Sequence, residues 1–215
     1  MPETTGRTTD QLIHRLTQDA RPVRRLRPPF VRVAIWIASV AAGATAIVSA
    51  LADVPVFMAR TQDTRQMIEL AATLSTGVLA IVAAFEMSLP DRARAWALLP
   101  LPTLALWIGS AGTGCVQNWI AGVPSDLAES ADCFGIIVAT SLPLGIALLW
   151  MLRRAKPLSP GPVAAMGGLG IAGISAFLLQ FFHPFDVTVI DLAIHAVAVA
   201  LVVGLSAWSA RAVPA

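Results

Sequence analysis

The chain has 215 residues, of which 56% are hydrophobic and only 13% are charged, with a formal net charge of +2. A soluble domain carries about 25% charged residues, so too few are present here to cover a water-exposed surface of this size. The composition excludes a disordered chain, a basic nucleic-acid-binding domain and an ordinary soluble enzyme, and we expect no direct contact with nucleic acid. We therefore predict an integral protein of a lipid bilayer.

Residues 1–28 form a polar segment that is rich in arginine. Residues 7–32 hold seven of the fifteen lysine and arginine residues of the chain. Roughly 30 polar residues ahead of the first apolar stretch exceed what usually precedes the apolar core of a signal peptide. We therefore expect this segment to be retained in the working protein.

A short amphipathic helix is predicted within this segment. Residues 8–21 read TTDQLIHRLTQDAR, whose first four residues fit a capping box, and Pro22 ends the helix. The side chains of Leu12, Ile13 and Leu16 fall on one face. From the residues alone, two interpretations stay equally open: the helix lies on anionic lipid, or its apolar face binds a groove in a partner protein.

Six continuously apolar stretches are long enough to cross a membrane, which takes about 20 residues. Backbone amides in lipid must pair within their own segment, so each stretch is predicted to be a helix. We expect prolines to kink the third and fourth spans, and an outer loop over about 114–132. The predicted spans cover about 30–51, 67–89, 96–113, 133–152, 162–182 and 188–208. The fold class is thus all-α: six transmembrane helices over residues 29–215, preceded by the cytosolic segment 1–28.

The basic residues predict the orientation of these spans. With the N-terminus inside, 13 of the 15 lysine and arginine residues lie on the inner side, and only Arg60 and Arg65 lie outside. This asymmetry predicts that both termini are cytosolic, under the positive-inside rule.

Several stretches resemble one known family. They are DQLIHRLTQDARPVRRLRPP before the first span, the turn SLPDRARAWALLPL, the loop GCVQNWIAG, ADCFG in the fourth span and IDLAIHAVAVAL in the last. In this order, on six spans, they resemble the NrsF-type membrane anti-sigma factors of proteobacteria. The resemblance implies a protein of the bacterial inner membrane whose N-terminal segment binds an extracytoplasmic-function (ECF) sigma factor. It favours a protein partner over lipid for the N-terminal helix.

The same resemblance implies roles for residues of that helix. Apolar anchors would be Leu12, Ile13 and Leu16. Polar contacts that set the register would be Asp10, Arg15 and Asp19.

Two cysteines, Cys115 and Cys133, are candidates for sensing. They lie 18 residues apart on the predicted outer side, where an oxidising compartment permits a disulfide, but packing as small apolar residues accounts for them equally well. The resemblance places the second family cysteine at His183, which cannot form a disulfide, unless Cys115 replaces it. Cys115, Cys133 and His183 together could bind zinc or copper, although no spacing motif supports this.

Ionisable residues within spans are costly and indicate function by default. Glu86 lies toward the inner end of the second span, and Asp191 and His195 lie four residues apart on one face of the last. We interpret Asp191 and His195 as an intrahelical pair that transmits an outer signal. Glu69 lies near the outer interface, where hydration accounts for it.

The sequence GLGIAG at 168–173 matches a dinucleotide-binding pattern but lies inside the fifth span, with no strand before it. We interpret Ala164, Gly168 and Ala172 as a ridge of small residues for close helix packing. No catalytic motif or cofactor site is evident, so we predict a protein that is not an enzyme and has no cofactor.

Two functions other than that of an anti-sigma factor are also compatible with the sequence. The first is a thiol redox protein that passes electrons between Cys115–Cys133 and a quinone. The second is a small transporter that uses Glu86, Asp191 and His195 along a polar path. The sequence leaves the signal, the particular sigma factor and the oligomeric state open.

Overall fold

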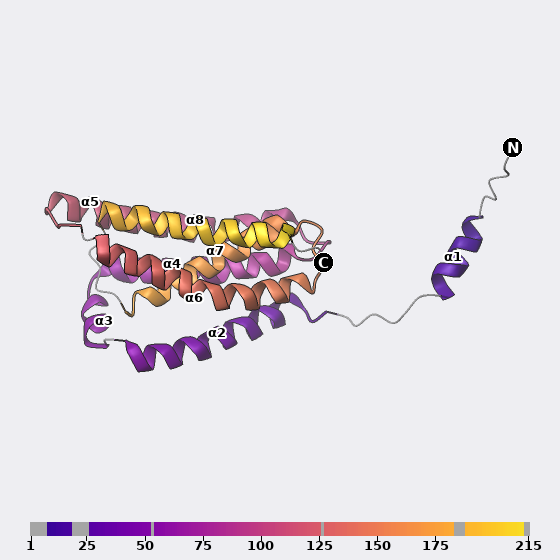
Figure 1. The fold of residues 1–215 in the computed structure, drawn as a ribbon, viewed down its shortest axis with the longest axis horizontal. Coiled ribbons are helices and arrows are strands. Elements are labelled where there is room, and N and C mark those ends of the chain that lie inside the picture. The colour runs from indigo at the N-terminus through magenta and orange to yellow at the C-terminus, as the bar shows by residue number, and fades with distance from the viewer. Residues whose placement is uncertain (1–7, 19–25, 53, 126, 183–187, 213–215) are drawn as a thin grey trace.

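A computed structural model describes residues 8–18, 26–52, 54–125, 127–182 and 188–212 (Figure 1). These residues form helices, and no strand occurs among them. Two short helices are α1 (Thr9–Gln18) and α3 (Val54–Arg60). The long helices are α2 (Pro29–Leu51), α4 (Thr64–Met87), α5 (Leu101–Ile120), α6 (Leu127–Arg153), α7 (Pro160–Leu179) and α8 (Val189–Ala212), and a five-residue 3-10 helix, η1 (Arg94–Leu98), precedes α5. Six segments, η1 and α5 counted as one, are long and apolar enough to cross a membrane, as predicted.

The third span is longer than predicted. It was expected to end near 113, whereas α5 continues to Ile120, and the expected loop over 114–132 is wrong because α6 already begins at Leu127. Polar residues lower the hydropathy there without ending the helix. Gln117 and Asn118 are polar, yet the helix continues past them, and the N–H of the C-cap residue Ala121 donates to the carbonyl oxygen of Gln117 at 3.0 Å.

The prolines of the third span begin a helix instead of kinking one. Pro100 is the N-cap of α5, and Pro102 lies in its first turn, where a missing backbone N–H costs no intrahelical bond. The expected kink is therefore wrong, and a junction between η1 and α5 takes its place. Pro143 does lie inside α6.

Helix α7 is the centre of the bundle, between α4, α6 and α8 (Figure 1). A Cβ atom on Gly173 would lie 2.9 Å from Cα of Gly77 on α4. A Cβ atom on Gly168 would lie 2.8 Å from Cα of Val203 on α8. Only glycine permits these close approaches, so the interpretation of GLGIAG as a packing ridge is confirmed.

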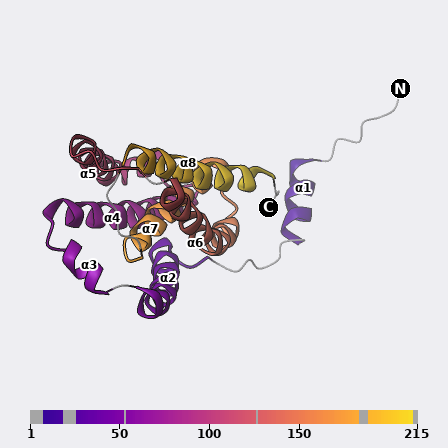
Figure 2. The ribbon, with the colours of Figure 1, turned by 60° about the vertical axis from the view of Figure 1, so that its left-hand side comes forward.

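Helix α2 lies at one edge of the bundle (Figures 1 and 2). Its buried side chains gather near its first turns: Arg32, Val33 and Trp36. Trp36 belongs to the main apolar cluster, which also contains Phe85 of α4 and Leu148 of α6. Helix α2 is thus anchored close to the point where the N-terminal segment enters it.

The two ends of the bundle differ in charge. At the end where α2 and α7 begin and α4, α6 and α8 end, which we call the basic end, the described basic residues are Arg27, Arg32, Arg92, Arg94, Arg153, Arg154, Lys156 and Arg211. At the other end, which we call the opposite end, they are Arg60 and Arg65.

Candidate functional site

Helix α1 stands apart from the six long helices in both views (Figures 1 and 2). None of its residues is buried. Its apolar side chains are exposed by 47% at Leu12, 52% at Ile13 and 63% at Leu16. At about 100° per residue these three side chains share one third of the helix surface, so α1 presents an apolar face that no other described element covers.

The polar residues expected to accompany this face are also exposed where they are described. Asp10 and Arg15 lie on the surface of α1, and Asp10 is in its first turn, where a carboxylate is favoured. Asp19 lies outside the described residues. On the far side of α1, the amide nitrogen of Gln18 and Nε2 of His14 are 2.9 Å apart.

At the basic end, Glu86 forms an ion pair with Arg92. The Arg92 Nε atom lies 3.0 Å from the carboxylate of Glu86, which occupies the last turn of α4. The same carboxylate borders a groove of about 450 Å³ between α2 and α4. Apart from Glu86, the groove is lined by Phe30, Val33, Ala34, Ile37, Ala38 and Val82.

Arg32 is a buried basic residue that sequence reasoning counted only as a topological charge. Its Nη2 donates to the carbonyl oxygen of Met151 at 2.6 Å, and its Nη1 donates to the hydroxyl of Ser88 at 3.4 Å. Its guanidinium carbon lies 4.7 Å from the centroid of the Phe85 ring. These contacts join α2 to the ends of both α4 and α6.

At the opposite end, Asp191 caps the helix that contains it. Its carboxylate accepts hydrogen bonds from the backbone N–H of Thr188 at 3.0 Å and from the Thr188 hydroxyl at 2.6 Å. Thr188 returns a contact, since its hydroxyl accepts from the Asp191 N–H at 3.3 Å, which completes a capping box. The Ser130 hydroxyl of α6 also donates to Asp191, so the carboxylate ties two helices together.

His195 contacts Asp191 through the main chain. Its Nδ1 atom lies 3.0 Å from the carbonyl oxygen of Asp191, one turn earlier in α8. The Asp191 carboxylate accepts its hydrogen bonds from Thr188 and Ser130. Sequence reasoning missed both hydroxyl partners, although Thr188 and Asp191 have the spacing of a capping box.

Cys115 and Cys133 are both buried and no disulfide joins them. Cys115 lies in α5 and Cys133 in α6, so neither lies in a loop. Cys133 packs against Ile137, Leu179 and Ala198. Among the described residues, no three His, Cys, Asp or Glu side chains are grouped to hold a metal ion, and His183 lies outside that set.

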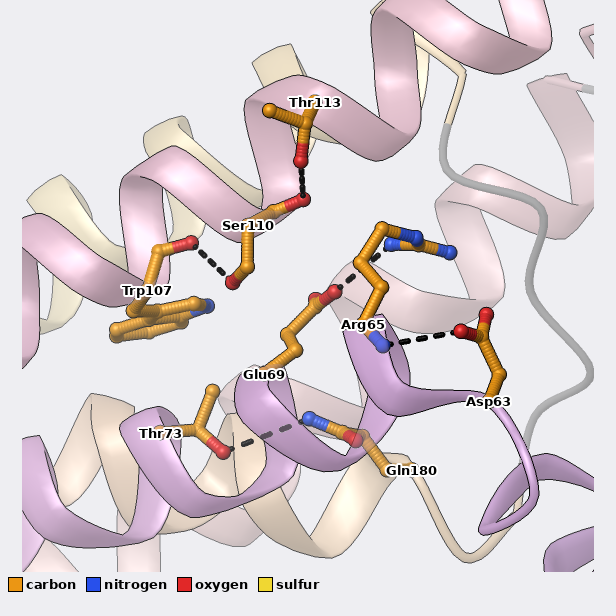
Figure 3. Close-up of polar contacts among 8 residues, drawn as sticks. All are labelled: Asp63, Arg65, Glu69, Thr73, Trp107, Ser110, Thr113 and Gln180. Atoms are coloured by element: carbon orange, nitrogen blue, oxygen red, sulfur yellow. Dashed lines mark hydrogen bonds and ion pairs between the residues drawn. The ribbon is translucent and has the colours of Figure 1, made fainter.

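A set of polar residues lies between α4, α5 and α7 at the opposite end (Figure 3). Arg65 and Glu69 form an ion pair at 3.3 Å, and the guanidinium lies directly over Gly114 of α5, where a Cβ atom would collide with it. The Gln180 amide donates to the Thr73 hydroxyl at 3.4 Å. Glu69 therefore has an ion-pair partner on its own helix.

These observations define a helical membrane protein with six candidate spans and an exposed helix ahead of the first. The chain belongs to the NrsF family, described as negative regulator of sigma F, whose family model matches residues 16–213. This confirms the resemblance drawn from the sequence. A sigma factor is thus the implied partner, and regulation is the implied role. No curated protein and no solved structure matches the chain.

Proposed function

We propose that the protein is a membrane-bound anti-sigma factor that holds an ECF sigma factor through residues 1–28. The exposed apolar face of α1 carries this proposal. Three aliphatic side chains face outward on a helix of only ten residues, which is too short to be stable alone in water. Such a helix is stabilised by laying its apolar face in a groove of a partner protein.

The charge of α1 supports a protein partner over a lipid surface. Asp10 and Arg15 place both signs on a short helix, whereas helices that bind anionic lipid carry mainly lysine and arginine on the polar face. In this proposal Leu12, Ile13 and Leu16 insert into the sigma factor, and Asp10, Arg15 and Asp19 set the register.

The positive-inside rule supports a cytosolic position for this segment. The basic end holds eight described lysine and arginine residues, and the opposite end holds two. We place the basic end and both termini in the bacterial cytosol, where a sigma factor is found, and the six spans in the inner membrane. The opposite end then faces the envelope.

Release is proposed to follow an envelope or oxidative signal received at the opposite end. Cys115, Cys133 and the polar residues around Glu69 and Asp191 lie toward that end. The signal must change the relative stability of two states of the bundle, because a signal that acts equally on both shifts nothing. The role is binding and release rather than catalysis.

Co-purification from membranes tests this function. The full chain is co-expressed in turn with each ECF sigma factor of the source genome, and the sigma factor retained on the purified membrane protein is measured. We expect the double substitution Leu12→Asp/Leu16→Asp to abolish retention, because charged side chains cannot enter an apolar groove.

The matched control is Gln11→Asp/Gln18→Asp, which adds the same charge to the far side of α1. We expect this control to retain the sigma factor. Equal retention by both double variants would show that the apolar face of α1 is not the binding surface.

A further inference from the structure

Arg32 is placed between the C-terminal ends of two helices. Met151 is in the last turn of α6, and Ser88 is the C-cap residue of α4. The last four carbonyls of a helix have no partner within the helix and carry partial negative charge. The Arg32 guanidinium therefore binds the end of α6 directly, at the Met151 carbonyl, and the end of α4 through the Ser88 hydroxyl.

The surroundings of Arg32 explain how a buried cation is tolerated there. Only 5% of the residue is exposed, and an unpaired charge so placed would be expensive. Its charge is met by the two helix ends and by the face of the Phe85 ring, while the Ser88 hydroxyl is itself held by donation to the Phe85 carbonyl at 2.6 Å. The carboxylate of Glu86, near the same end of α4, forms its ion pair with Arg92 rather than with Arg32.

Beyond Trp36, α2 packs against the bundle through side chains that are only partly buried: Ile37, Val40, Ala44 and Val48. Within the most apolar stretch of α2 only 6% of residues are buried. Arg32, Val33 and Trp36 are its buried anchors, all within its first two turns or so. The position of the start of α2 therefore depends on where the ends of α4 and α6 stand.

We propose that Arg32 is the positioning residue that couples the six-helix bundle to the N-terminal segment. Seated between the ends of α4 and α6, it holds the segment in its sigma-binding position. When those two helix ends move apart, it leaves them and the start of α2 shifts. This inference rests on the proposed function. Coupling is reciprocal, so sigma-factor binding also stabilises the seated position of Arg32.

Binding measurements on the full chain in lipid nanodiscs test this coupling. The purified sigma factor is titrated onto the wild-type protein, Arg32→Gln, Arg32→Lys and the control Arg94→Gln, which removes the same charge from an exposed residue of the basic end outside residues 1–28. We expect Arg32→Gln to bind about fivefold more weakly or worse, the lower end of typical coupling factors. Arg94→Gln should bind as the wild type does.

A distance measurement separates a coupling role from general stabilisation. Spin labels are attached at Phe30→Cys and Leu158→Cys, both exposed positions at the basic end, in a chain whose native cysteines are replaced by alanine. We expect the distance distribution to lengthen and broaden in Arg32→Gln. Adding sigma factor should narrow the distribution in the Arg32-containing chain and leave it unchanged in Arg32→Gln.

If Arg32→Gln does not fold, both measurements are made on Arg32→Lys. Lysine keeps the charge but has a single ammonium group in place of the guanidinium fork, so we expect weaker binding and a longer distance than with arginine. Binding and distances equal to those of the control would overturn the proposal. A wild-type chain that binds no sigma factor would contradict the proposed function. The effect of Arg32→Gln on the distance would still test whether Arg32 holds the start of α2 at the ends of α4 and α6.

Discussion

Helices α2 and α7 have nearly the same hydropathy but opposite positions in the molecule. The mean hydropathy of the most apolar stretch is 2.0 in α2 and 1.8 in α7, yet 6% of that stretch is buried in α2 and 72% in α7. The difference lies in residue size. Helix α7 contains five glycines, each with a neighbouring atom close to where a Cβ would stand, whereas Gly43 of α2 has none within 4 Å. In lipid, close backbone approach decides which helix becomes central.

The largest effect is expected from a substitution that breaks the packing of α7. In Gly173→Ala the new Cβ would lie 2.9 Å from backbone atoms of Gly77, which cannot move aside as a flexible side chain would. We expect a loss of about 2 to 3 kcal/mol in the free energy of unfolding, measured in detergent on the full chain. Gly43→Ala is the matched control on α2 and should change it by less than about 0.5 kcal/mol. A similar loss in both variants would contradict this account of the packing.

A smaller effect is expected where α8 is tied to α6. In Asp191→Asn one carboxylate oxygen becomes an NH2 group, so a donor from Thr188 or Ser130 loses its acceptor. We expect a loss of about 1 to 2 kcal/mol in the free energy of unfolding. Asp132→Asn, an exposed carboxylate near the same end, is the control and should have little effect. An unchanged stability in Asp191→Asn would mean that the capping box contributes nothing.

The smallest effect is expected from the loss of a single hydrogen bond between α6 and α7. The hydroxyls of Ser141 on α6 and Ser175 on α7 are 3.0 Å apart and buried. Hydrogen bonds between membrane helices contribute about 0.6 kcal/mol on average, and we expect Ser175→Ala to cost that much. Ser39→Ala on α2 removes only a hydroxyl bonded within its own helix and should cost less. Equal losses would remove this distinction between the two helices.

The six spans could be predicted from the sequence because hydropathy is a local property. The end of α5 could not, since Gln117 and Asn118 lower the local hydropathy while the backbone hydrogen bonds of the helix continue past them. For α7 the sequence predicted a ridge of small residues but not the central position of the helix. The position of α2 at the edge depends on which helices pack against one another, and the sequence of a single span does not determine this.

The candidate site was predictable to a similar extent. The apolar face of α1 follows from the spacing of Leu12, Ile13 and Leu16, and the structure contains a helix there. The capping partner of Asp191 was present in the sequence as Thr188, three residues earlier, and could have been found by that rule. The partners of Arg32 could not, because Ser88 and Met151 are 56 and 119 residues away along the chain.

The central claim is that residues 1–28 hold the sigma factor. Its most direct test is a titration of labelled ECF sigma factor onto the full chain in nanodiscs and onto a chain that begins at Pro29, with the helical content of both checked first. The account predicts saturable binding to the full chain and none to the shortened one. Equal affinity for the two chains would contradict it and would place the binding surface on the basic end of the bundle.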